Sequence, residues 1–234
     1  MPEHKLHILS TRPVDISRIE EAQQKGIILD VLSFIETEAI QTIEVQQEIE
    51  WASVQQATVV FTSMNAVEAV TEMLDGHIPD WSIYCMGYKT KQLITDYFGE
   101  TAISGTADNA AELADEMLEN EEPEEVIFFC GNQRRDELPG KLRSHHISVN
   151  EIVVYETLPV EHKVEKEYDA VLFFSPSAAE SFFKKNKLTA RAVVFAIGNT
   201  TANTVKRFCS NKIIISKLPG KEELVTEALE YFSA

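Results

Sequence analysis

The sequence has few cysteines, and none of them lies in a metal-binding pattern. Cys85, Cys130 and Cys209 are far apart in the chain, and neither a C-x-x-C nor an H-E-x-x-H motif is present. Zinc sites in proteins depend on such close spacings of cysteine and histidine. We therefore predict no metal site and interpret the three cysteines as ordinary buried or surface thiols.

Long apolar runs are also missing. No run approaches the ~18 residues of a membrane-spanning helix. The first ten residues, MPEHKLHILS, lack the basic segment, apolar stretch and cleavage site of a signal peptide. We therefore expect a cytoplasmic protein with no membrane partner. The 234 residues, 44% of them hydrophobic, are enough for one large or two small globular domains.

Positive charge is scarce. The chain has 21 Lys and Arg against 38 Asp and Glu, so its formal charge is 21 − 38 = −17. This balance argues against nucleic acid as a partner, because nucleic-acid binding needs a positive field. It does not exclude a small anionic ligand, since the local potential of a cleft can oppose the net charge.

Motifs for common cofactor and nucleophile chemistry are absent as well. The chain has no G-x-G-x-x-G after its first apolar run, no G-x-x-x-x-G-K-[ST] and no G-x-S-x-G. Binding of a dinucleotide or a nucleoside triphosphate therefore has no motif support, and neither does a serine nucleophile on a strand-to-helix turn.

What the sequence does contain is an alternation of short apolar runs with amphipathic segments. Continuous apolar runs of this length are typical of strands buried on both faces of a parallel sheet, with helices between them. We predict an α/β fold with strands at Leu6–Leu9, Ile27–Leu32, Val59–Phe61, Ile83–Met86, Val126–Cys130, Ile152–Tyr155, Val171–Phe174, Val193–Ile197 and Ile213–Ile215. Helices are predicted to include Ile16–Gln24, Ala66–Leu74, Ala110–Asn120, Ala178–Lys185 and Glu222–Phe232.

The two halves of the chain resemble each other. VVFTSMNAVE at Val59–Glu68 aligns with VLFFSPSAAE, which begins 112 residues later. YCMGYKT at Tyr84–Thr90 aligns with FAIGNTT, and AAELADEML at Ala110–Leu118 aligns with KEELVTEAL, both at an offset of 111 residues. Three collinear matches at nearly one offset predict two similar α/β domains.

The order of the elements predicts that one domain is discontinuous. We expect residues 1–35 to fold with residues 159–234, while residues 36–158 form the second domain. The chain would cross between them near 33–38 and 153–158, where β-prone segments would pair as a two-stranded connector. Such a double crossing creates a cleft between domains, where ligands commonly bind.

The repeated motifs lie where a strand ends and a helix begins, the edge at which open α/β sheets bind ligands. We interpret Asn65 with Glu68 and Ser177 with Glu180 as capping boxes. Hydroxyl groups at these turns come from Thr62, Ser63, Ser175, Thr200 and Thr201. We expect Gly87 and Gly198 to allow tight turns that leave backbone N–H groups free for carboxylates or phosphates. The alternative is that these residues only cap helices.

Basic side chains occur at comparable positions. Arg12 and Arg135 closely follow buried strands and are the stronger candidates for ligand contacts, whereas Lys91 and Arg134 are more easily read as parts of a solvated face. Tyr155 ends the apolar run of the second crossing, where an aromatic ring either packs or faces the cleft. Residue chemistry alone therefore predicts a cleft for an anionic ligand.

Taken in order, these motifs resemble the uroporphyrinogen-III synthase family over essentially the whole chain. The resemblance is carried by LSTRP, FTSMNAVEAV, MGYKTKQLI, GTADNAAELA, FFCGNQRRDELPGKL, EIVVYET, FFSPSAAESFF and FAIGNTTANTV. It implies two parallel-sheet α/β domains with a two-stranded connector and the active site in the cleft between them. Asp30 departs from the family pattern, because many members have proline there.

The resemblance implies a cofactor-independent, cyclising hydro-lyase. Its substrate is hydroxymethylbilane, a linear octacarboxylate. The bilane loses its hydroxyl to give an azafulvene, ring D attacks to form a spiro-pyrrolenine, and the ring recloses inverted as uroporphyrinogen III. Because the free bilane closes uninverted, the main task of the enzyme is to hold both ends in one geometry. The family also suggests a monomer and a possible transient handover of substrate from the preceding enzyme of the pathway.

The resemblance assigns Tyr155 to catalysis, since a tyrosine is protonated at neutral pH and can assist departure of the hydroxyl. The predicted substrate-binding residues are Arg12, Thr62, Ser63, Lys89, Thr90, Gly131, Asn132, Arg135, Ser175, Gly198, Thr200 and Thr201. We expect acidic side chains on outer helices such as Glu112–Glu125, with Arg12, Lys89 and Arg135 turned toward the substrate. A two-lobed ligand-binding protein and a non-catalytic family member are the alternatives.

Overall fold

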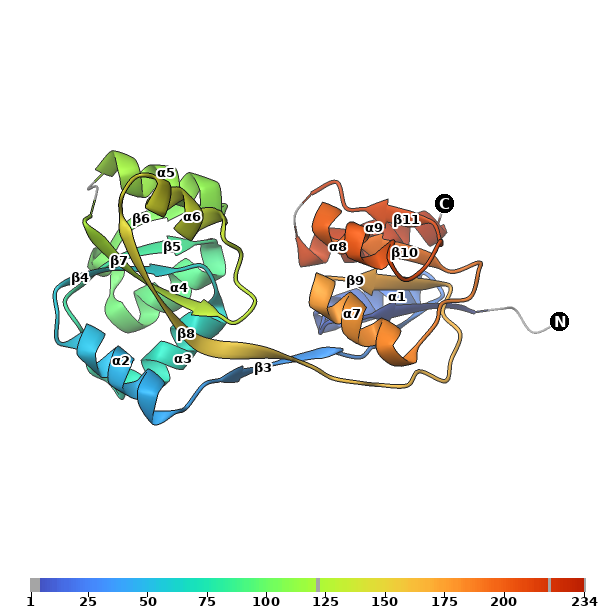
Figure 1. Ribbon diagram of the computed structural model, residues 1–234. Helices are drawn as coiled ribbons and strands as arrows, with labels where there is room; N and C mark the ends of the chain where they lie inside the picture. The colour runs from blue at the N-terminus through green and yellow to red at the C-terminus, as the bar shows by residue number, and fades with distance from the viewer. Residues whose placement is uncertain (1–4, 121–122, 219, 234) are drawn as a thin grey trace. The chain divides into compact units, whose positions relative to one another are not determined.

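The computed structural model describes residues 5–120, 123–218 and 220–233 (Figure 1). Within these ranges the chain divides into two compact units. Unit 1 comprises the residues up to Glu36 together with those from Leu158 onward, and unit 2 comprises Thr37–Thr157. Each unit has its own sheet and its own core, so each is described separately.

Unit 1 is built on a five-stranded sheet in the order β11-β10-β9-β1-β2, and every pairing is parallel. Its strands are β1 (Leu6–Ser10), β2 (Ile27–Val31), β9 (Ala170–Phe173), β10 (Val193–Ala196) and β11 (Ile213–Ile215). Its helices are α1 (Ile16–Gln24), α7 (Pro176–Lys185), α8 (Asn199–Val205) and α9 (Lys221–Ser233). One buried cluster lies under α1 and α9, and another lies under α7 and α8.

Unit 2 is built on a six-stranded sheet in the order β3-β8-β7-β4-β5-β6. Its strands are β3 (Ile35–Ala39), β4 (Ala57–Phe61), β5 (Trp81–Met86), β6 (Ile103–Ala107), β7 (Glu125–Gly131) and β8 (Ser148–Pro159). Its helices are α2 (Ile43–Ser53), α3 (Met64–Leu74), α4 (Tyr88–Phe98), the short 3₁₀ helix η1 (Glu100–Ala102), α5 (Ala110–Asn120) and α6 (Glu137–Ser144). From β8 to β6 the pairings are parallel.

Helices cover both faces of each sheet, and the predicted α/β class with parallel sheets is confirmed (Figure 1). Every predicted apolar run overlaps a strand, because side chains that are buried on both faces leave no polar alternation. The run-based reading missed β6, whose sequence ISGTA has only one buried position and lies at the edge of the sheet. β3 and β8 are neighbours, but their role as a two-stranded connector stays a prediction.

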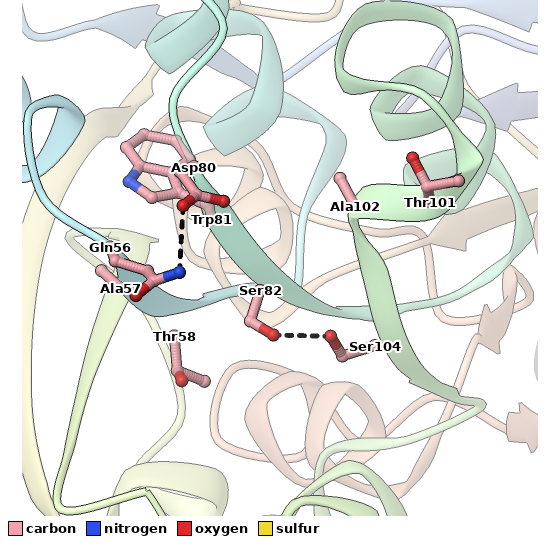
Figure 2. Close-up of a pocket in the computed structure, with 9 residues that line it drawn as sticks. All are labelled: Gln56, Ala57, Thr58, Asp80, Trp81, Ser82, Thr101, Ala102 and Ser104. Carbon is pink, nitrogen blue, oxygen red and sulfur yellow. Dashed lines mark hydrogen bonds between the residues drawn. The ribbon is translucent and has the colours of Figure 1, made fainter.

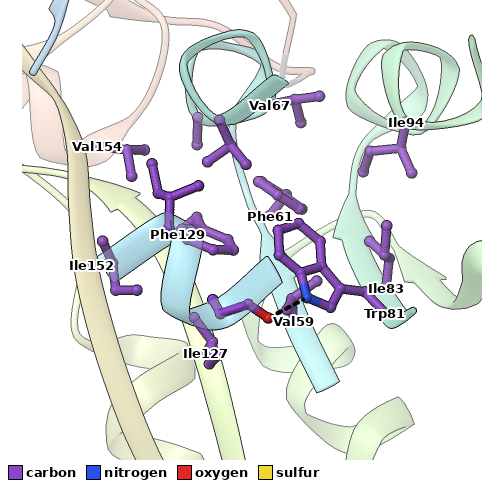
Figure 3. Packing of buried hydrophobic residues seen from close by; sticks show 14 of the residues in the cluster. Val59, Phe61, Val67, Trp81, Ile83, Ile94, Ile127, Phe129, Ile152 and Val154 are labelled. Atoms are coloured by element: carbon purple, nitrogen blue, oxygen red, sulfur yellow. Dashed lines mark hydrogen bonds between the residues drawn. The ribbon is translucent and has the colours of Figure 1, made fainter. Parts of the chain in front are cut away.

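Aromatic side chains in the core of unit 2 pack between the ends of neighbouring strands. Phe61 at the end of β4 stacks on Phe129 of β7 with ring centroids 5.2 Å apart (Figure 3). Trp81 packs against Phe129, and its indole N–H donates to the carbonyl of Ala52 at 3.0 Å. Both phenylalanines are fully buried. This packing fixes the ends of β4 and β7 relative to each other.

Candidate active site

The sheet of unit 2 has a topological switch point between β4 and β7. After β4 the chain continues outward to β5 and β6, and it then returns to place β7 on the other side of β4. Because the strands are parallel, the turns that follow them lie at one edge of the sheet, and the crevice at a switch point is the usual ligand site of such folds. Thr62 and Ser63 follow β4, while Gly131 and Asn132 end and follow β7.

A cavity of about 420 Å³ opens at this switch point. It brings together Thr62, Ser63, Gly131, Arg135 and Tyr155, all of which the sequence had assigned to the site. The remaining lining residues, which were not predicted, are Met86, Asp108, Asn109, Ala110, Phe128, Arg134, Glu137 and Leu138. Asn109 could have been recognised as a helix cap, because it directly precedes α5 and its side chain accepts from the N–H of Glu112 at 3.0 Å.

The turn after β4 is closed by a serine cap. The hydroxyl oxygen of Ser63 accepts from the N–H of Asn65 at 3.2 Å. In unit 1, Ser175 caps α7 in the same way by accepting from the N–H of Ala178 at 3.1 Å. The capping boxes predicted from Asn65 and Ser177 were therefore wrong by two residues. Both helices begin earlier than those boxes assume, in the second case at Pro176, whose fixed φ suits the first helical turn.

Tyr155 is held at the edge of the cavity by the end of β7. The pairing of β7 with β8 shifts register at Gly131, which lies opposite Tyr155. The N–H of Asn132 donates to the carbonyl of Tyr155 at 3.1 Å, and the side-chain oxygen of Asn132 accepts from the N–H of Thr157 at 3.0 Å. The Tyr155 ring is half-buried against the core of unit 2, and its hydroxyl has no hydrogen-bond partner among the described residues.

The two arginines after β7 differ in their surroundings. Arg134 forms ion pairs with Glu151 and Asp136, so its charge is already compensated. Arg135 is exposed and has neither an ion pair nor a hydrogen bond within the described ranges. Of the two, Arg135 is the one whose charge is left available to a ligand, and its role as the ligand-binding arginine stays a prediction. Asp108 and Glu137 also line the cavity, so its walls carry charges of both signs.

Lys89 and Thr90 lie farther along the same edge, in the first turn of α4. Gly87 caps this helix with a φ of +84°, a backbone conformation that glycine adopts easily, as predicted. The first N–H groups of the helix have no intrahelical acceptor and could donate to a ligand. The Thr90 side chain is buried. The adjoining cavity of about 440 Å³ is lined by Gly87, Tyr88, Lys91, Thr106, Ala107, Asp108, Glu112 and Glu116. Glu112 and Glu116 of α5 therefore lie beside this part of the edge, whereas we expected the acidic side chains of this segment on an outer face. Glu121 and Glu122 of the same predicted segment lie outside the described residues.

The remaining predicted residues follow strands of unit 1. Here β1 and β9 form the equivalent switch point. The Thr11 hydroxyl, which is fully buried, donates to the carbonyl of Leu172 at 2.7 Å and so fixes the turn that carries the exposed side chain of Arg12. The half-buried Ser175 follows β9 at this edge.

The turn after β10 carries the last three predicted residues. Gly198 caps α8 with a φ of −173°, an extended conformation open to any residue, so the predicted need for glycine there was wrong. Thr200 is exposed, and the Thr201 side chain is buried.

A third hollow in unit 2 lies at the opposite end of the sheet. Its volume is about 450 Å³, and it is lined by residues at the amino ends of β4, β5 and β6 (Figure 2). The Gln56 side chain donates to Asp80 at 3.0 Å, and the hydroxyls of Ser82 and Ser104 are 2.7 Å apart. These four side chains hydrogen-bond one another in pairs, and the hollow contains no predicted site residue. We therefore do not assign the site to this hollow, although its volume is similar to that of the cavity at the switch point.

Two further observations bear on the class of protein. Among the described residues, no helix is long and apolar enough to cross a membrane. Within the same part of the chain, no three His, Cys, Asp or Glu side chains gather in a way that would hold a metal ion.

Comparison with known proteins shows which family the whole chain is similar to. Residues 17–226 match the family model described as uroporphyrinogen-III synthase HemD. Among solved structures, uroporphyrinogen-III synthetase from Helicobacter pylori matches with a TM-score of 0.67 and 19% identity over 97% of this chain and 99% of that one. A mutant uroporphyrinogen III synthase from Thermus thermophilus matches with a TM-score of 0.63 and 14% identity over 97% of each chain. At these identities the structural matches establish the fold.

Proposed function

The chain belongs to the uroporphyrinogen-III synthase family, and on that basis we propose that it acts as a hydro-lyase that cyclises hydroxymethylbilane to uroporphyrinogen III. The observation that carries this proposal is the family match over residues 17–226, which leaves out only short segments at each end of the chain. The reaction belongs to tetrapyrrole biosynthesis. It removes water from the linear bilane, closes the macrocycle and inverts ring D.

We propose that the cavity at the β4–β7 switch point receives the reacting end of the bilane. Support comes from the residues that line it: the capped turn at Thr62 and Ser63, a tyrosine hydroxyl, and an arginine. Within the described part of the chain this hydroxyl has no hydrogen-bond partner and this arginine has no ion pair. Hydroxyl, guanidinium and backbone N–H groups are the donors that pair with carboxylates, and charge-assisted pairs are the strongest of these.

In the first step, Tyr155 donates its proton to the departing hydroxyl group. The C–O bond breaks, water leaves, and the azafulvene cation remains on the bilane. Ring D then attacks this carbon through its substituted position, and the spiro intermediate fragments and recloses in the inverted sense. The proton that ring D loses as it regains aromaticity restores the phenol, so no other reactant is consumed. We propose on this balance that the reaction needs no cofactor.

Binding of the carboxylates is the second task of the site. We propose that backbone N–H groups at the first turns of α3, α4, α7 and α8 donate hydrogen bonds to propionate and acetate carboxylates, as do Arg135 and Lys89 of unit 2 and Arg12 of unit 1. Holding both ends of a flexible chain converts ring closure into an oriented intramolecular step. In this proposal Thr90 and Thr201 contribute backbone N–H groups, because their side chains are buried.

We further propose that the two compact units are the two folding domains of the enzyme, joined by β3 and β8 as connector. A monomeric enzyme in the cytoplasm that receives its unstable substrate from the preceding enzyme of the pathway fits the same picture.

The test is an isomer assay. Freshly prepared hydroxymethylbilane is mixed with the purified protein, and the oxidised products are separated into type I and type III isomers. We expect type III to predominate, whereas the protein-free control gives type I. Binding of the bilane with only type I product would instead identify a ligand-binding protein or a non-catalytic family member.

A further inference from the structure

Gly131 has almost no space above its backbone. A Cβ atom built on Gly131 would lie 2.4 Å from Cζ, 2.6 Å from Cε2 and 2.8 Å from the hydroxyl oxygen of Tyr155. Heavy atoms that are not bonded to each other do not approach so closely, since carbon atoms make contact at about 3.5–4.0 Å. The phenol of Tyr155 therefore occupies the space that any side chain at residue 131 would need.

The glycine is not required by the backbone conformation. Among the glycines with positive φ are Gly26, Gly76, Gly87 and Gly99, and Gly131 is not one of them. Gly131 ends β7, where glycine is unfavourable because it costs backbone entropy and contributes no packing. A glycine within a strand often marks a close approach of another group, and here that group is the outer end of the Tyr155 ring.

The backbone next to the ring is clamped as well. The N–H of Asn132 and the side-chain oxygen of Asn132 hold the main chain of β8 on both sides of Glu156, at Tyr155 and at Thr157. The register shift at Gly131 brings Tyr155 opposite the glycine, where an unshifted pairing would place Val154. The strand is thus fixed by Asn132, and the ring lies in the space left by Gly131.

We propose that Gly131 is a positioning residue for Tyr155: its missing side chain lets the phenol lie over the carboxyl end of β7 and so sets where the hydroxyl stands in the cavity. This inference rests on the proposed function, in which that hydroxyl donates the proton. A methyl group at residue 131 turns the ring away and moves the hydroxyl from its place, while the carboxylate-binding groups stay where they are.

The experiment combines two substitutions. Initial rates of uroporphyrinogen III formation are measured for the full chain, G131A, Y155F and the double variant G131A/Y155F, with the free energy of unfolding from urea titration. We expect G131A to lower kcat by about tenfold or more with less than a twofold change in KM. In the Y155F background, where no hydroxyl remains to be positioned, G131A should lower kcat no further. The ring still clashes there, so the loss of stability should persist.

Gly105 provides a matched control in the same unit. A Cβ atom at Gly105 would lie 2.6 Å from Cε1 of Tyr84, so G105A creates a similar clash with a tyrosine ring outside the cavity. It should destabilise the protein without lowering kcat when measured well below its unfolding midpoint. A full kcat in G131A, or an equal loss of kcat from G131A with and without the Tyr155 hydroxyl, overturns the positioning role. An unchanged kcat in Y155F alone removes Tyr155 from the proposed mechanism. That outcome concerns the proposed function, and it is measured separately from the outcomes that overturn the positioning role of Gly131.

Discussion

At the scale of single residues, Tyr155 carries the sharpest prediction. Tyr155→Phe removes one oxygen that has no hydrogen-bond partner in the described part of the chain, so the free energy of unfolding should stay within about 0.5 kcal/mol. If the hydroxyl acts as general acid, kcat falls about a hundredfold or more, because positioned acids contribute roughly 10²–10⁴-fold. KM should change little. Stopped assays of the type III product, with urea unfolding in parallel, check both parts.

The neighbouring arginines form a natural pair of variants. Arg135→Gln should raise KM about threefold to tenfold and leave stability unchanged, because it removes an exposed charge that has no partner among the described residues. Arg134→Gln should leave Glu151 paired with Arg143 alone, and since the Glu151 side chain is only 15% exposed, the protein should lose about 1–2 kcal/mol of stability. Steady-state kinetics and urea titration of both variants distinguish the roles. The reverse pattern would transfer substrate binding to Arg134.

The cysteines give a prediction that depends on pH. Burial raises the pKa of the Cys85 thiol to about 11, and burial together with the nearby Glu151 carboxylate raises that of Cys130 to about 11. Only the thiolate reacts with alkylating agents, so at pH 8 both are protonated almost entirely, whereas Cys209 is partly exposed. Iodoacetamide should therefore modify Cys209 alone in the folded protein and all three thiols in urea, with mass spectrometry as the readout. Label on native Cys130 would show that the strand end at Gly131 opens.

At the scale of elements, the serine caps test whether a turn holds a helix, a substrate or both. Ser63→Ala removes the acceptor for the N–H of Asn65 and should cost about 1 kcal/mol of stability. Ser63→Asp keeps a cap but places a carboxylate in the cavity, so stability should be largely restored while KM for the polyanionic substrate rises. Urea titration and kinetics of the two variants separate these effects. If KM for Ser63→Asp equals the native value, Ser63 caps the helix and does not contact the substrate.

The elements also show how far the sequence reaches. Strands buried on both faces were predictable because a run such as Val126–Cys130 has no other stable environment in a soluble domain. The caps were misassigned because Asn65 and Ser177 are followed three residues later by a glutamate, as a capping box requires, whereas the true caps two residues earlier are followed at that spacing by Ala66 and Ala178. The role inferred for Gly131 was not predictable, since it depends on a register shift that brings Tyr155 across from it.

The site residues divide in the same way. Thr62, Ser63 and Tyr155 could be proposed from their positions after or within predicted strands, and one cavity contains all three. The ion pairs that separate Arg134 from Arg135 involve Asp136 and Glu151, whose position beside β7 follows from sheet order. Adjacent residues of identical type look alike in a sequence, and the surrounding charges decide which of them remains available to a ligand.

At the scale of the whole molecule, the net charge of −17 opposes a substrate that is itself a polyanion. Repulsion between them acts over long distances and is screened as the Debye length falls from about 30 Å at 0.01 M salt to about 8 Å at 0.15 M. The contacts with Arg135 and the backbone N–H groups act at short range and are screened less. We therefore predict that kcat/KM rises as ionic strength increases from 0.01 to 0.15 M, since association is the step that repulsion slows.

The control is a change of charge away from the site. Glu48 is exposed on α2 and does not line the cavity, so Glu48→Lys should raise kcat/KM at 0.01 M salt and have little effect at 0.15 M. Arg135→Gln should lower kcat/KM at both ionic strengths, because it removes a short-range contact. Type III production is followed across the salt series for the three proteins. A kcat/KM that falls steadily from the lowest salt would mean that local positive charge dominates the approach of substrate, and the repulsion argument would then be wrong.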